Sequence, residues 1–118
     1  MKYGDISLST EFINHSPQEL YEAWREGEEM QEGQKFETPD GYLWGEVVKL
    51  EPGERIVHSV RSRDFPADAE AARTEVKFEK KNGGTRMTVT HEGVPEAQRE
   101  AFEASWKKHF DRPMKRYL

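Results

Sequence analysis

The chain is short and rich in charge: of its 118 residues 35% are charged and 34% hydrophobic, and the formal net charge is −5. That length fits one domain with a lean core, and the absence of cysteine excludes disulfides, thiolate catalysis and cysteine-ligated metals. An acidic surface repels phosphate backbones and anionic lipids, so we expect no nucleic-acid or membrane partner. With no long apolar run and no signal-peptide pattern, the expected location is the cytoplasm.

The first two elements are predicted to be a strand and a short helix. Residues 3–14 alternate between apolar and polar side chains, which is typical of a half-buried strand. The apolar face of that strand consists of Ile6, Leu8 and Phe12. In the following segment, SPQELYEAWREG, Ser16 and Glu19 form a capping box at the start of a helix, and Gly27 is its expected end. The polar stretch between Trp24 and Phe36 is then a short lid.

Five strands are predicted between Gln34 and Glu92, with turn signals at PDG, EPGE and NGG. The apolar positions of the first two strands are Phe36, Tyr42, Trp44, Val48 and Leu50. Ile56, His58 and Val60 share a face of the third strand. In the hairpin that turns at NGG, the residues on one face are Val76, Phe78, Met87, Val89 and His91. Alternation therefore places His58 and His91 on apolar faces.

The last segment, PEAQREAFEASWKKHFDRPMKRYL, is predicted to be a long helix. Its apolar stripe consists of Phe102, Trp106, His109, Phe110, Met114 and Tyr117. Pro113 is expected to bend or end the helix, because it cannot donate a hydrogen bond to the carbonyl of His109. The order strand, short helix, five strands, long helix predicts a single α+β domain over residues 1–118, with a curved antiparallel sheet around the C-terminal helix.

A series of segments follows in a characteristic order: SPQELYEAW, DGYLWGEVVKLEPGERIVHSVR, FP, TEVKFE, GGTRMTVTHEGVPE, a helical tryptophan and MKRYL. From about Ser7 to Leu118 the chain thereby resembles the activator of heat-shock protein 90 ATPase homologue family, within the START-like (SRPBCC, Bet v-like) superfamily. The resemblance implies a helix-grip fold with a cavity between sheet and helix. The eukaryotic co-chaperone has a further N-terminal domain that engages the chaperone, and nothing in this sequence resembles it. The resemblance therefore does not transfer chaperone activation.

His91, just before Gly93, has two interpretations. As a histidine at the cavity mouth it would act as a general base or contact a ligand. As the last residue of a strand it would only bond to the backbone beside the turn. We favour the structural role, because catalysis needs an orienting partner that the sequence does not display. His58 is likewise interpreted as a core or cavity-wall residue. His58, His91 and His109 lack metal-ligand spacing, so no metal or cofactor is predicted.

The predicted function is non-enzymatic binding of a small hydrophobic or aromatic molecule in the cavity, which is expected to open toward the lid between Trp24 and Phe36. The predicted lining consists of Tyr42, Trp44, His58, Val60, Phe78, Val89, His91 and Trp106. Two alternatives remain open. One is a polyketide cyclase- or aromatase-like enzyme that uses a cavity histidine. The other is a protein-interaction module whose partner is a chaperone or a second copy of the chain.

Overall fold

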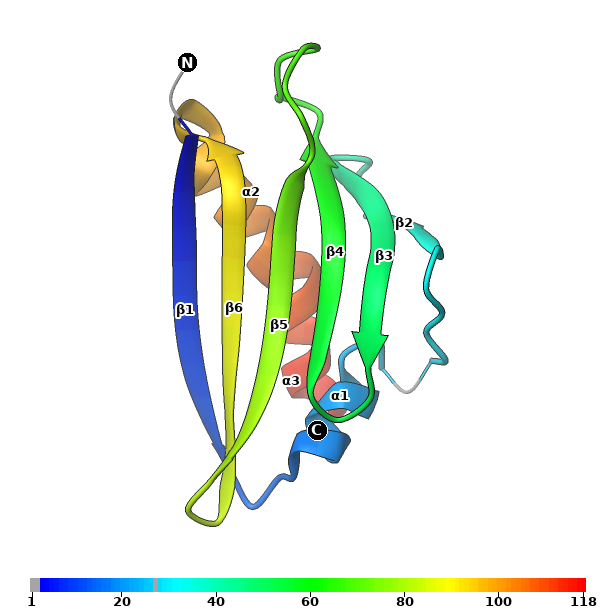
Figure 1. Ribbon diagram of the computed structural model, residues 1–118, viewed down its shortest axis with the longest axis vertical. Helices are drawn as coiled ribbons and strands as arrows, with labels where there is room; N and C mark the ends of the chain where they lie inside the picture. Colours follow the sequence, from blue (N-terminus) through cyan, green and yellow to red (C-terminus); the bar gives the residue numbers. More distant parts are fainter. Residues whose placement is uncertain (1–2, 27) are drawn as a thin grey trace.

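The computed structural model describes residues 3–26 and 28–118. Gly27, the predicted end of the first helix, lies outside the described residues. The elements follow the predicted order (Figure 1): β1 (Tyr3–Ile13), α1 (Pro17–Ala23), β2 (Lys35–Glu37), β3 (Leu43–Glu51), β4 (Arg55–Ser62), β5 (Ala72–Lys81) and β6 (Gly84–Pro95). The C-terminal helix then comprises a 3-10 turn (Glu96–Gln98), α2 (Arg99–Trp106), a π-helical turn (Lys107–Asp111) and α3 (Arg112–Tyr117).

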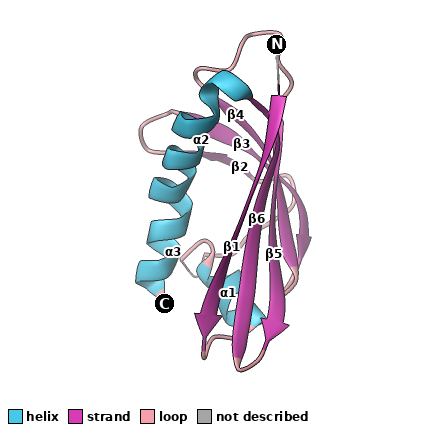
Figure 2. Cartoon of the chain, turned by 90° about the vertical axis from the view of Figure 1, so that its left-hand side faces the viewer, coloured by secondary structure: helices cyan, strands magenta, loops and turns pink. Residues whose placement is uncertain are grey.

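The strands form one antiparallel sheet in the order β1-β6-β5-β4-β3-β2. The sheet curves, and the C-terminal helix lies along its inner face, with α1 beneath the end of that helix (Figure 2). The outer face of the sheet is open to solvent. The predicted α+β helix-grip fold is therefore confirmed. Residues 3–13 and 84–95 pair at one edge, so β1 is an edge strand that lies beside β6.

Local rules predicted α1 and the β5–β6 hairpin correctly. The capping box forms in both directions: the Glu19 amide donates to Ser16 Oγ over 3.1 Å, and the Ser16 amide donates to Glu19 Oε1 over 3.2 Å. In the hairpin, Phe78 pairs with Met87 and Thr74 pairs with His91. The inner face of β6 thus carries the predicted set of side chains toward the helix.

In β3 the alternation differs from the prediction because of a β-bulge. The pairing of β3 with β4 shifts between Val47 and Lys49, so the side chains on either side of the bulge change faces. Leu43 and Val47 are buried on the inner face, whereas Trp44 points outward and is 38% exposed. One continuous alternation from Tyr42 to Leu50 had placed Trp44 inside, and that assignment is wrong.

The C-terminal helix continues through Pro113 instead of ending there. Just before the proline, the Arg112 amide donates to the carbonyl of Lys107, five residues back, which defines the π-helical turn. This wider turn takes up one extra residue, and the proline ring then fits at the start of α3. Side chains spaced four residues apart therefore continue along the same sides of the helix as far as Lys115.

Candidate functional site

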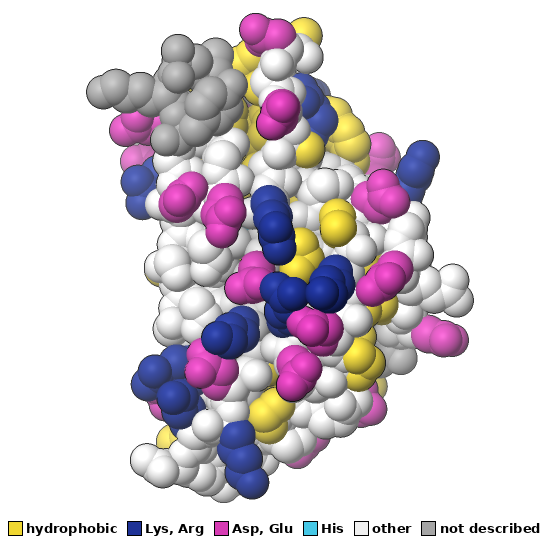
Figure 3. All heavy atoms as spheres, in the orientation of Figure 1, with side chains coloured by type: hydrophobic (Ala, Val, Ile, Leu, Met, Phe, Trp, Pro, Cys, Tyr) yellow, Lys and Arg dark blue, Asp and Glu magenta, His cyan; other side chains and the backbone are white. Residues whose placement is uncertain are grey.

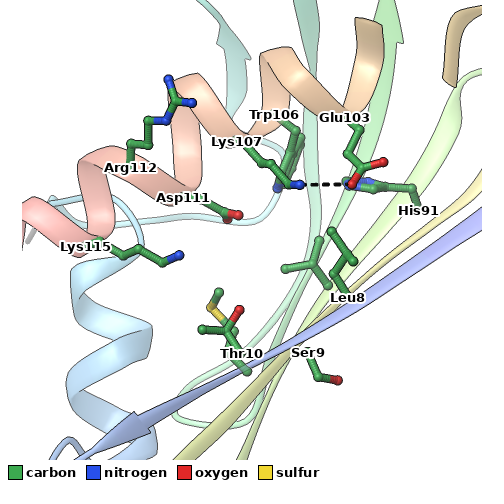
Figure 4. A pocket seen from close by; sticks show the side chains of 12 residues that line it. Leu8, Ser9, Thr10, His91, Glu103, Trp106, Lys107, Asp111, Arg112 and Lys115 are labelled. Atoms are coloured by element: carbon green, nitrogen blue, oxygen red, sulfur yellow. Dashed lines mark ion pairs between the residues drawn. The ribbon is translucent and has the colours of Figure 1, made fainter. Parts of the chain in front are cut away.

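A pocket of about 350 Å³ lies between the C-terminal helix and the strands β1 and β6 (Figure 4). We call it the β1 pocket. Its lining consists of Leu8, Ser9, Thr10, Met87, Val89, His91, Glu103, Trp106, Lys107, Asp111, Arg112 and Lys115. The sheet contributes an apolar floor and a few hydroxyls, and the helix contributes Trp106 and all the charged groups.

The pocket opens at β1 because aromatic side chains fill the opposite side of the inner face. Trp24 stacks on Phe110 of the helix, with ring centroids 5.7 Å apart, and Phe36 meets the same ring edge-on at 5.6 Å. On the other side, the inward residues of β1 include Leu8 and Thr10, which pair with Val89 and Met87 of β6 and line the pocket. Leu8 is consequently 42% exposed although it belongs to the inner face.

The lid was therefore expected on the wrong side. Trp24 and Phe36, which bound the lid segment, pack against His58 in the aromatic core, and the hollows that border them are small, about 160 Å³ and 150 Å³. The opening lies at the β1 edge instead. The physical reason is the size of the inward side chains: aromatic rings close the core beside β2, and Leu8 and Thr10 leave it open beside β1.

Charged side chains of the helix form the rim of the pocket. Glu103, Lys107, Asp111 and Lys115 recur every four residues, parallel to the buried row of Phe102, Trp106, Phe110 and Met114. Lys107 Nζ lies 3.1 Å from Glu103 Oε1. Figure 4 shows Asp111 and Lys115 extending from the helix toward the space above β1. The rim thus brings both signs of charge to an apolar floor.

Asp111 is the unusual member of this rim. Its Oδ1 atom is buried and has no hydrogen-bond partner within the described part of the chain. Burial raises the pKa of the Asp111 carboxyl, and the neighbouring charges of Lys115 and Lys107 oppose that shift only in part. The pocket therefore holds a carboxyl group with an unsatisfied oxygen and a reduced tendency to ionise.

His91 lies on the pocket floor and is 2% exposed. Its Nδ1 atom lies 2.8 Å from Thr74 Oγ1, and its ring meets Phe102 and Trp106 edge-on, with both centroid distances 5.0 Å. Burial lowers the pKa of His91 to about 4, with Glu103 opposing the shift. Its partner is a side chain on β5, not the backbone, and β6 runs on to Pro95, so the expected strand-end position is wrong. The ring is a weak base at neutral pH.

His58 is enclosed in the core and is 1% exposed. The aromatic rings around it belong to Trp24, Phe36, Trp106 and Phe110. Burial lowers the pKa of His58 to about 3, and the nearby Thr74 backbone opposes this shift. Neither ring nitrogen has a hydrogen bond of standard geometry among residues 3–26 and 28–118. The prediction of a core histidine fits this position, and His58 does not line the β1 pocket.

The structure brings only part of the predicted lining together. Val89, His91 and Trp106 line the β1 pocket. Val60 and Phe78 are buried in the core, and Phe78 meets Tyr21 edge-on at 6.2 Å. Tyr42 and Trp44, like His58, lie outside this pocket: the Tyr42 hydroxyl donates to Asp64 Oδ2 over 2.9 Å, and Trp44 borders a hollow of about 260 Å³ on the outer face.

The rim was missed by sequence reasoning, although its signal is present in the sequence. The charges at 103, 107, 111 and 115 flank the apolar stripe at the same four-residue spacing. Acids early and bases late in this helix also complement the helix dipole, which is a sufficient structural reason for the same charges. Leu8 and Thr10 carried no such signal, because an inward leucine on a strand is ordinarily covered.

Other candidate sites are weaker. A hollow of about 370 Å³ beside α1 is mostly polar, with a lining of Gln18, Tyr21, Glu22, Glu28, Glu29, Met30 and Tyr117. Within residues 3–26 and 28–118, no group of three or more His, Cys, Asp or Glu side chains is arranged to hold a metal ion. None of the helices described is both long enough and apolar enough to cross a membrane.

Comparisons with known proteins agree with this fold. Residues 14–118 match the family model described as Activator of Hsp90 ATPase homolog 1-like protein. Activator of 90 kDa heat shock protein ATPase homolog 1 from Homo sapiens is 28% identical over 117 residues, which cover 89% of this chain. The match covers 34% of that relative, so the chain spans about a third of its length.

Solved structures share the architecture at low sequence identity. PFC0360w, an HSP90 activator from Plasmodium falciparum, superposes with a TM-score of 0.74 at 19% identity, covering 94% of this chain and 93% of the other. CalU16 from Micromonospora echinospora gives a TM-score of 0.72 at 16% identity, covering 96% of this chain and 82% of the other. These structural similarities show a shared fold, whereas the family model matches the sequence itself over residues 14–118. The chain therefore belongs to the family of Activator of Hsp90 ATPase homolog 1-like proteins.

Proposed function

We propose that the protein binds a small amphipathic molecule in the β1 pocket without converting it chemically. The observation that carries this proposal is an apolar floor left uncovered between sheet and helix, where Leu8 is 42% exposed. A volume of about 350 Å³ falls within the range of roughly 300–1,000 Å³ typical of ligand pockets. Leu8, Met87, Val89 and Trp106 supply the apolar walls, and the helix supplies polar groups at the mouth.

The state of His91 supports binding over catalysis. A general base works best when its pKa lies near the operating pH, and the pKa of His91 is lowered to about 4. Its Nδ1 contact is the neutral hydroxyl of Thr74, whereas a triad-like site would orient the ring with a carboxylate. A cyclase- or aromatase-like reaction, the alternative considered from the sequence, would need this ring to exchange protons near neutral pH.

Binding is expected to be measurable with an uncharged fluorescent probe, N-phenyl-1-naphthylamine. We expect a saturable fluorescence increase at micromolar concentration, which corresponds to roughly −8 kcal/mol. Leu8→Trp should fill the floor of the pocket and weaken binding at least about tenfold. Ile13→Trp is the matched control, because Ile13 lies on the same strand, is exposed and does not line the pocket.

Circular dichroism would establish that both variants stay folded. Equal affinity of wild-type and Leu8→Trp proteins would locate the probe elsewhere. A wild-type protein with no saturable signal would refute the proposal.

The second candidate function is a chaperone-linked interaction module. Two observations favour it. The first is the family match, since the human relative is named as an activator of a heat shock protein ATPase. The second is the outer face of the sheet. That face carries interspersed acidic and basic side chains (Figure 3), and β3 exposes Trp44 and Val48 on it. Patches of this kind occur at protein interfaces.

This candidate predicts that the protein raises the ATPase rate of a 90 kDa heat shock protein, and that Trp44→Ala removes the effect while Leu8→Trp does not. Interface tryptophans commonly contribute more than about 2 kcal/mol to binding. Steady-state ATP hydrolysis measures the effect, and Ile13→Trp again serves as a control. An unchanged ATPase rate over a full titration would exclude stimulation. Sedimentation of the protein alone would test self-association, which stays a prediction.

A further inference from the structure

We propose that the β1 pocket selects amphipathic carboxylates, with the apolar part of the molecule on Leu8, Val89 and Trp106 and the carboxylate beside Lys115 and Arg112. This inference rests on the proposed binding function and adds the chemical class of the ligand. The chain has a net charge of −5, yet the pocket is lined by three cationic side chains and two carboxyl groups. A local excess of positive charge in an acidic protein attracts anions to that point.

The available positive charge belongs to Lys115 and Arg112. Lys107 is engaged, because its Nζ lies 3.1 Å from Glu103 Oε1. Arg112 and Lys115 form no ion pair within residues 3–26 and 28–118, and both side chains are exposed. An arginine guanidinium and a lysine ammonium at one mouth can both donate hydrogen bonds to a carboxylate. Both residues line the pocket together with the apolar floor, and Figure 4 shows the Lys115 side chain extending toward the space above that floor, so a single molecule can contact the floor and Lys115 together.

Asp111 fits the same ligand. An ionised Asp111 beside Lys115 would repel an incoming carboxylate, but burial raises the pKa of this carboxyl, so protonating it when a carboxylate binds is easier than for an exposed aspartate. A neutral carboxyl can donate a hydrogen bond to a bound carboxylate and so satisfy the unpartnered buried Oδ1 atom of Asp111. The other titratable or charged groups that line the pocket are Glu103, Lys107, Arg112, Lys115 and His91, and β1 contributes none.

Three ligands with the same ten-carbon chain separate charge from apolar contact. Decanoate, decan-1-ol and decylamine would each displace N-phenyl-1-naphthylamine from the wild-type protein at pH 7.5. We expect decanoate to displace the probe at about five- to tenfold lower concentration than decan-1-ol, and decylamine to be the weakest. The advantage of decanoate should shrink as salt is added, because the cations are exposed.

A pair of double variants tests the residues. Arg112→Gln with Lys115→Gln should reduce the advantage of decanoate over decan-1-ol to twofold or less, and leave decan-1-ol unchanged. Lys108→Gln with Arg116→Gln removes the same charge from exposed positions of the same helix that do not line the pocket, and should preserve the advantage. Asp111→Asn keeps the shape of the side chain and an N–H donor, and should increase decanoate affinity most at high pH.

The outcomes are distinguishable. If decan-1-ol and decanoate both displace the probe but with equal potency, or if both double variants lose the advantage equally, the carboxylate inference is refuted and the proposed function stands. If Leu8→Trp leaves displacement by every ligand unchanged, both proposals are refuted. If acetate alone displaces the probe at matched ionic strength, the cations bind anions without using the apolar floor, which also overturns the inference.

Discussion

Replacing Trp106 with alanine is expected to lower the free energy of unfolding by roughly 3–5 kcal/mol. The side chain is 1% exposed and lies where the helix meets the sheet. Its ring stacks on Phe110 at a centroid distance of 4.2 Å and meets His58 and His91 edge-on at 5.5 Å and 5.0 Å. Removal leaves a cavity among rigid rings that cannot collapse into it. For a domain of about 5–15 kcal/mol total stability, the loss is a large fraction.

Urea denaturation at neutral pH measures this change, and Trp44→Ala is the matched control. Trp44 is the same residue type but lies half-exposed on the outer face of β3. Its replacement should cost less than about 1 kcal/mol. If Trp106→Ala cost no more than Trp44→Ala, the phase of the C-terminal helix in this structure would be contradicted. The comparison also removes the general effect of losing a tryptophan.

Sequence predicted those parts of the fold that depend on local chemistry. The capping box at Ser16 and Glu19, the NGG hairpin and the helix stripe through Trp106 each follow from residues close together in the chain. Burial of His58 and His91 followed from alternation, because the pairing of β4 and β5 is regular at His58 and the irregularity of β6 beside β1 begins only after His91. The family resemblance is confirmed by the match over residues 14–118.

The site was less predictable, for two physical reasons. A bulge between Val47 and Lys49 reverses the faces of β3, and no residue type marks it in advance, so Trp44 was assigned to the interior. The position of the pocket depends on which side of the inner face is filled. That outcome is decided by contacts such as Trp24 with Phe110, which lie far apart in sequence. Neither the order of the elements along the chain nor the alternation of apolar residues indicates that the helix leaves Leu8 exposed.

Acidification is expected to destabilise the protein between about pH 6.5 and pH 4 through its two buried histidines. Burial lowers the pKa of His58 to about 3 and that of His91 to about 4. In the unfolded chain both rings would titrate near 6.5. Below that value the unfolded state binds more protons than the folded state, so the free energy of unfolding falls as the pH is lowered, and the loss levels off at the folded pKa. Each histidine contributes a loss of roughly 3 kcal/mol by pH 4.

The carboxyl groups change the free energy of unfolding either at lower pH than the histidines do or in the opposite direction. Hydrogen bonds lower the pKa values of Glu19, Asp40 and Glu51, so their stabilisation is lost mainly below about pH 4.5, where unfolded carboxylates protonate. Burial raises the pKa of Asp111, so that residue gains stability relative to the unfolded state as the pH falls. A loss between pH 6.5 and pH 4.5 is therefore assigned to histidine.

Replacing these two rings should flatten the pH dependence of stability. His58→Phe suits a site enclosed by aromatic rings, and His91→Asn keeps a polar group that can reach Thr74. In the double variant, the free energy of unfolding measured by urea denaturation should change little between pH 6.5 and pH 4.5, even if it is lower at pH 7. His15→Gln, at a more exposed position, should retain the wild-type slope. A double variant with the wild-type slope would show that protonation of His58 and His91 does not drive acid unfolding. The two rings would then be accommodated in their charged form inside the aromatic core, contrary to the burial that the structure assigns them.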